Sequence, residues 1–189
     1  MDILAPWITF KAYDYIKRFI HSDMKVFELG IGGSTLFFID HGSAIISVEH
    51  DPMWIKTVTD RIISSPHSSN LRIEFVEKDP IGLRSHDRCL SYSRDYFGIS
   101  FCNYVTHIED YNDFFDLIFI DGRARSDCLK ISINKLASGG IIVLDNSNRK
   151  EYSEGIEYLT KHKGFIQLKM TGPALGQEPF SETSIFKLP

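Results

Sequence analysis

The fold of this 189-residue chain is decided by the stretch Lys25-Val26-Phe27-Glu28-Leu29-Gly30-Ile31-Gly32-Gly33-Ser34-Thr35. A short apolar run with one acidic residue breaks into glycines, and a second apolar run follows over 36–39. This pattern predicts a buried strand that turns sharply into a helix. Gly30 and Gly32 lack a Cβ, so they permit a tight turn and let a small molecule approach the main chain. Free N–H groups at the start of the helix would add a positive local field.

Apolar runs recur along the rest of the chain and alternate with segments of helical spacing. We expect strands at 25–29, 44–49, 71–77, 115–121 and 141–145, a closing antiparallel pair at 165–170 and 183–188, and helices at 7–21, up to 41, and at 51–63, 125–137 and 150–163. Strands alternating with helices indicate an α/β fold: a doubly wound, mostly parallel sheet with helices on both faces. The length suits a single domain, 1–189. Residues 80–113 have no clean period, and we expect them to form an insertion or lid over the ligand site.

The composition narrows the partners and the location. A net charge of −4 lacks the basic footprint of a nucleic-acid-binding protein, and an RNA acceptor would need a local basic patch. The three cysteines contain no CxxC pair, which predicts reduced thiols rather than a zinc cluster. No apolar run is long enough to span a membrane, and the N-terminus has no signal pattern. We therefore expect a cytoplasmic protein without a membrane partner, and a homodimer stays open.

Acidic residues occupy the expected carboxyl ends of the strands, where ligands bind in such sheets: Glu28, Glu49, Asp79, Asp121 and Asp145. A dinucleotide fingerprint would need a third glycine at the position of Thr35. Glu28 would also repel a pyrophosphate. A carboxylate there suits a ligand with a positive end, such as the amino acid portion of S-adenosylmethionine.

The segment 28–34 resembles the first motif of class I S-adenosylmethionine-dependent methyltransferases. Val48-Glu49 resembles the second motif, 119–122 the fourth, and 138–143 the approach to the fifth strand. The resemblance covers nearly the whole chain and implies a Rossmann-like, seven-stranded sheet whose last strand is antiparallel. Ser34 departs from the family, which often has a third glycine there.

The cofactor residues follow from the strand ends and from this resemblance. Glu49 lies about 20 residues after the glycine turn, where a carboxylate can accept hydrogen bonds from both ribose hydroxyls, unless it is only a solvated acid. Asp79 matches an adenine-binding acid of the family or, alternatively, caps the loop before Pro80. Glu28 would hold the glycine loop or, through water, the methionine amino group. The full cofactor set also includes Gly30, Gly32, Ser34, Thr35, His50 and Asp121.

The reaction centre is expected around Asp121, Asp145 and Asn146. Their oxygens form a ligand set that Mg²⁺ prefers, and the set resembles the metal site of catechol-type O-methyltransferases. The alternative is turn and helix-capping chemistry. Catechol-type O-methyltransferases have a lysine base at the position where this chain has Ala124. Arg123 and its neighbour Arg125 cannot act as bases, but they could bind an anionic substrate or pair with nearby acids.

The sequence therefore favours an S-adenosylmethionine-dependent methyltransferase that methylates an oxygen of a small molecule or glycan, with Asp121, Arg123 and Asp145 as catalytic candidates and Mg²⁺ as a further cofactor. Two alternatives stay open. One is a nucleoside-binding module without methyl transfer, which the missing base motivates. The other is an NAD-dependent oxidoreductase, which Glu28 at the end of the first strand argues against. The two tryptophans, Trp7 and Trp54, are assigned to the core or to helix faces.

Overall fold

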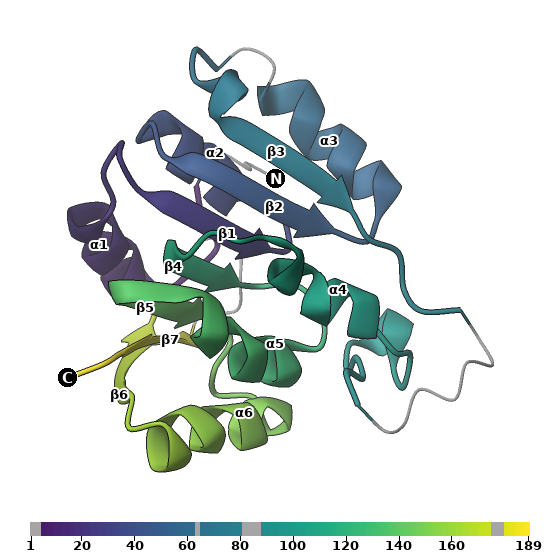
Figure 1. Ribbon diagram of the computed structural model, residues 1–189, viewed down its shortest axis with the longest axis vertical. Helices are drawn as coiled ribbons and strands as arrows, with labels where there is room; N and C mark the ends of the chain where they lie inside the picture. Colours follow the sequence, from purple (N-terminus) through teal and green to yellow (C-terminus); the bar gives the residue numbers. More distant parts are fainter. Residues whose placement is uncertain (1–4, 63–64, 81–87, 175–179) are drawn as a thin grey trace.

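One seven-stranded sheet runs through the computed structural model, which describes residues 5–62, 65–80, 88–174 and 180–189 (Figure 1). Its strand order is β3-β2-β1-β4-β5-β7-β6. The strands are β1 (Lys25–Leu29), β2 (Ala44–Glu49), β3 (Leu71–Phe75), β4 (Phe115–Ile120), β5 (Leu136–Leu144), β6 (Ile166–Gly172) and β7 (Ser181–Lys187). Strands β1 to β5 are parallel, and β7 runs antiparallel to both β5 and β6. The predicted mostly parallel α/β sheet is confirmed, including its closing antiparallel pair.

Helices cover both faces of the sheet. They are α1 (Phe10–Phe19), α2 (Gly33–Asp40), α3 (Pro52–Ile62), α4 (Cys102–Thr106), α5 (Arg125–Ser132) and α6 (Ser153–Glu157). Successive strand residues point to opposite faces, so Leu117 and Phe119 of β4 pack with α1, α2 and α3, whereas Ile118 and Ile120 pack with α4, α5 and α6. Two apolar cores therefore sandwich a sheet whose central strands are buried on both sides, which explains their continuous apolar runs.

Most predicted boundaries agree with the structure. The expected bounds of β1 and β2 are correct, and Asp51 caps α3 by accepting from Met53 N at 2.9 Å. The edge position of β3 is also confirmed.

The later elements depart from the expected bounds. The fifth strand begins five residues earlier than expected, because 138–140 form an irregularity inside β5 rather than a turn before it. The helix expected at 125–137 ends at Ser132 and continues as a short 3₁₀ segment.

The connection from β3 to β4 contains α4 and two short 3₁₀ helices, and its residues 81–87 lie outside the described ranges. Phe101, Tyr104 and Ile108 of this connection are fully buried in the second core. Its expected role as a lid stays a prediction. The three cysteines are free thiols, as predicted. In the part of the chain that the structure describes, no helix combines the length and apolar character that a bilayer crossing needs.

Candidate functional site

The glycine turn between β1 and α2 owes its shape to two different demands. Gly30 has a φ of +97°, and a Cβ there would lie 2.7 Å from the backbone nitrogen of Gly122, so the loops after β1 and β4 touch at a point that only glycine allows. Gly32 is extended, with a φ of 173°, and a Cβ there would meet nothing within 4 Å. The backbone in front of Gly32 is therefore open to a ligand.

Glu28 supports this turn from below. Its side chain is fully buried and accepts hydrogen bonds from the hydroxyls of Ser34, Thr35 (2.6 Å) and Ser47 (2.6 Å). Thr35 Oγ1 in turn accepts from Gly32 N at 2.9 Å. Burial raises the pKa of Glu28 to about 7, although the three hydroxyl donors oppose the rise. Glu28 therefore fixes the start of α2. Ser34, and not Glu28, lines the cleft above.

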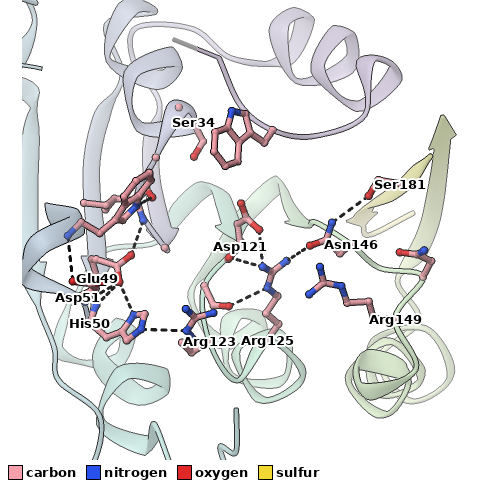
Figure 2. A pocket seen from close by; sticks show the side chains of 18 of the residues that line it. Ser34, Glu49, His50, Asp51, Asp121, Arg123, Arg125, Asn146, Arg149 and Ser181 are labelled. Carbon is pink, nitrogen blue, oxygen red and sulfur yellow. Dashed lines mark hydrogen bonds and ion pairs between the residues drawn. The ribbon is translucent and has the colours of Figure 1, made fainter. Parts of the chain in front are cut away.

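A cleft of about 690 Å³ opens above the turn at the carboxyl ends of β1 and β4 (Figure 2). This is where the strand order reverses, which is the usual ligand position in such sheets. Its lining residues are Trp7, Gly30, Ile31, Gly32, Gly33, Ser34, Glu49, His50, Asp51, Trp54, Asp121, Gly122, Arg123, Arg125, Asn146, Asn148, Arg149, Phe180 and Ser181. Of the predicted cofactor residues, the structure brings Gly30, Gly32, Ser34, Glu49, His50 and Asp121 together here.

Glu49 closes β2 and contributes its carboxylate to one end of the cleft. Oε1 accepts from the backbone nitrogens of His50 (2.7 Å) and Asp51 (3.0 Å), and Oε2 accepts from Ile31 N at 3.3 Å. His50 Nε2 accepts from Arg123 Nε at 3.2 Å, which leaves the ring proton on Nδ1. This Nδ1 lies 2.5 Å from Glu49 Oε1, but off the direction of a hydrogen bond. The carboxylate is thus held in place with acceptor capacity left on Oε2.

Asp79 lies elsewhere. It is buried outside the cleft lining and caps α4, because its Oδ2 accepts from Cys102 N at 2.7 Å and from Ser100 Oγ at 2.5 Å, while Oδ1 accepts from Asn103 N at 3.2 Å. The three donors belong to the segment 100–103, so the carboxylate caps this helix and not the loop before Pro80. Asp79 is buried and does not line the cleft, which separates it from a ligand bound there.

Arg125 joins the ends of β4 and β5. Its Nη2 donates to the backbone oxygen of Asp121 at 2.6 Å and forms an ion pair with its Oδ1 at 2.8 Å, and its Nε donates to Gly122 O at 3.0 Å. Its Nη1 donates to Asp145 O at 2.8 Å and to Asn146 Oδ1 at 3.2 Å. All three nitrogens of the guanidinium are therefore engaged. Figure 2 shows Arg125 between Asp121 and Asn146.

This arrangement does not fit the expected magnesium site. The guanidinium of Arg125 already lies between the proposed ligands as their cation. The fully buried carboxylate of Asp145 accepts from Thr183 Oγ1 at 2.8 Å and is not among the lining residues. Among residues 5–62, 65–80, 88–174 and 180–189, no cluster of three or more His, Cys, Asp or Glu is placed to hold a metal. These side chains are instead engaged by Arg125, Thr183 and Ser181, and we derive no step through a metal.

Asp121 lines the cleft and has a raised pKa. Burial raises its pKa to about 6, the ion pair with Arg125 opposes this, and the nearby Asp145 adds to it. Its side chain is 31% exposed and keeps part of its hydration, which limits the rise. Asp121 is therefore a carboxylate that ionises near neutral pH at the wall of a ligand cleft.

Sequence reasoning missed several lining residues. Trp54 was assigned to a helix face, yet its Nε1 donates to Ile31 O at 2.7 Å and fixes the glycine turn. Its position in the first turn of the helix after Glu49 was the available signal. Trp7 and Phe180 reach the cleft from segments far apart in sequence, and Arg149 comes from the loop after β5. No local pattern marks these three.

The comparisons with known proteins agree with the fold. No protein-family model and no curated sequence matches the chain. Solved structures do. The precorrin-6Y C5,15-methyltransferase of Geobacter metallireducens is 14% identical, with a TM-score of 0.61 over 95% of this chain and 87% of that one. An rRNA methylase of Streptococcus thermophilus is 12% identical, with a TM-score of 0.63 and 95% coverage of both chains. A Staphylococcus aureus protein, provisionally assigned as a caffeoyl-CoA O-methyltransferase, is 16% identical, with a TM-score of 0.65 over 97% and 86%.

At these identities the likeness shows the fold alone. The chain has the Rossmann-like fold of these methyltransferases. Their names point to three different acceptors, so the fold does not select one of them.

Proposed function

We propose that the protein transfers a methyl group from S-adenosylmethionine to a small-molecule acceptor. The observation that carries this proposal is the placement of two carboxylates, Glu49 and Asp121, on either side of an open glycine turn in one cleft. Glu49 Oε2 can accept from ribose hydroxyls, and Asp121 offers negative charge to the cationic methionine end. The methyltransferase fold of the solved neighbours supports the same donor.

The acids also argue against a dinucleotide. A pyrophosphate seated on the turn would face Asp121, and Glu28 lies directly beneath it. Like charges at this range are repulsive in a partly desolvated cleft. The donor proposed here is cationic at sulfur, so the same charges attract it.

Methyl transfer requires a lone pair of the acceptor to attack the methyl carbon in line with the departing sulfur. The carbon–sulfur bond breaks toward sulfur, and the acceptor loses its proton to a base. We assign that role to Asp121, because it is largely ionised above its raised pKa of about 6 and lies in the cleft wall. Arg123 orients the acceptor, and Asp145 supports the wall through Thr183. Oxygen is the proposed acceptor atom.

Calorimetry with S-adenosylmethionine and S-adenosylhomocysteine tests the donor. Glu49→Ala should weaken binding about tenfold, because it removes an acceptor shared by two hydroxyls. The matched control is Glu109→Ala, at an exposed acid outside the cleft lining. Failure of the wild-type protein to bind either compound refutes the proposal.

Two alternative functions can be distinguished from methyl transfer by separate measurements. Retention of NADH by the purified protein would favour the oxidoreductase. Binding of the donor without transfer of a labelled methyl group to any compound in a metabolite mixture would favour the nucleoside-binding module.

A further inference from the structure

Arg123 and Arg149 are cations of the cleft without a carboxylate partner. Both line its wall beside Asp121, and neither forms an ion pair with any acid in the described part of the chain. Arg125 differs from them, because its guanidinium is buried and all three of its nitrogens donate hydrogen bonds, one of them also forming the ion pair with Asp121. The structure thus separates one structural arginine from two that face a ligand space.

Arg123 is held in place but keeps donors to offer. Its Nε donates to His50, and its guanidinium lies 5.0 Å from the centre of the Tyr96 ring. These contacts fix the plane of the group. Its two terminal nitrogens make no hydrogen bond to any residue the structure describes, so they can form a fork for an anion.

Both arginines also border a narrow side pocket next to the cleft. Its lining includes the hydroxyl groups of Ser91, Ser93 and Ser126, and none of its described residues is an aspartate or glutamate. Ser91 Oγ and Ser93 Oγ lie 3.1 Å apart and share one hydrogen bond, so one hydroxyl proton of the pair is available to a ligand. The described lining therefore presents donors and positive charge.

This set of donors exceeds what one carboxylate can accept, and it suits the three terminal oxygens of a phosphate monoester. We propose that the acceptor is a phosphorylated small molecule whose phosphate is bound in the cleft between Arg123 and Arg149, at the mouth of the side pocket, with the atom to be methylated beside Asp121. This inference rests on the proposed function for its reaction. A small molecule is favoured over RNA because the pocket is narrow and the chain carries a net charge of −4.

The position of Arg149 keeps the proposed phosphate site apart from the site assigned to S-adenosylmethionine. Figure 2 shows Glu49, His50 and Asp51 on one side of Asp121, and Asn146 and Arg149 on the other. The donor is assigned to the first side, because it contains the ribose acid. The second side is therefore available for the acceptor.

The test is titration of phenyl phosphate into the protein saturated with S-adenosylhomocysteine. Arg149→Gln should weaken phenyl phosphate about tenfold and leave the S-adenosylhomocysteine affinity unchanged, because the exposed side chain contributes a charge-assisted fork. Arg149→Lys should recover only part of the loss, since an ammonium lacks the planar fork. Arg18→Gln, at an exposed arginine of α1 outside the cleft, is the matched control and should change nothing.

Four results overturn the inference. The first is tighter binding of benzoate than of phenyl phosphate, and the second is tighter, Arg149-dependent binding of a short single-stranded RNA. The third is that Arg149→Gln loses affinity for S-adenosylhomocysteine and not for phenyl phosphate. The fourth is that Arg149→Gln and Arg18→Gln bind phenyl phosphate equally well. If S-adenosylhomocysteine does not bind at all, the proposed function fails instead. The titration of phenyl phosphate into the protein alone then decides the anion site by the same comparison of variants.

Discussion

Replacing Glu28 with glutamine should remove a pH dependence from the stability of this protein. The carboxyl group is fully buried beneath the glycine turn, and burial raises its pKa from 4.5 to about 7. Between these values the folded protein binds more protons than the unfolded chain, so the free energy of unfolding falls as the pH rises through this window. A difference of this size corresponds to roughly 3 kcal/mol, because each pKa unit is worth about 1.4 kcal/mol.

Thermal unfolding between about pH 5 and about pH 8 measures this effect, since about 3 kcal/mol shifts the melting temperature of a chain this size by roughly 6–12 °C. The wild-type melting temperature should fall relative to that of Glu28→Gln across this range. Near pH 5 the two proteins should be similar, because the protonated acid and the amide have nearly the same shape and hydrogen-bonding groups. All other titratable groups are common to both proteins, so the difference between the curves reports on Glu28. Glu109→Gln, at an exposed acid, should follow the wild type. Parallel curves for wild type and Glu28→Gln would refute the reasoning.

The remaining predictions concern the turn and the strand ends. Gly32→Val should weaken S-adenosylhomocysteine binding at least tenfold by calorimetry without changing the melting temperature, because its side chain enters open space above an extended backbone. Gly30→Ala should instead lower the melting temperature, because its Cβ meets the Gly122 backbone at a left-handed φ, and unchanged melting would contradict that packing argument. Arg125→Met should lower the free energy of unfolding in urea by roughly 3 kcal/mol or more, since it leaves the partly buried Asp121 carboxylate and the carbonyl oxygens of Asp121 and Asp145 without their donor. Arg123 is partly exposed, so Arg123→Met should lower the free energy of unfolding by less than about 1 kcal/mol. Equal losses in the two variants would remove the distinction between the two arginines.

The sequence by itself determined the architecture and the strand ends that meet at the cleft. Apolar runs and helical spacing are local properties, so they located β1 and β2 within a residue and identified the parallel sheet. The rule that ligands bind beyond parallel strand ends then predicts Gly32, Glu49 and Asp121 at one edge of the sheet. Their assembly in one cleft agrees with this reasoning, because strand order alone brings those ends together.

Only the tertiary structure decided how each side chain is used. Asp79 and Glu49 both end strands in the sequence, yet the crossover after β3 brings donor groups to Asp79 and turns it into a helix cap. Arg125 and its neighbour Arg123 look alike in the sequence, but the distance between the ends of β4 and β5 makes one a buried cross-link and leaves the other facing the cleft. Hydrogen-bond partners such as these come from segments far apart along the chain. Packing selects them, and a local pattern does not carry that information.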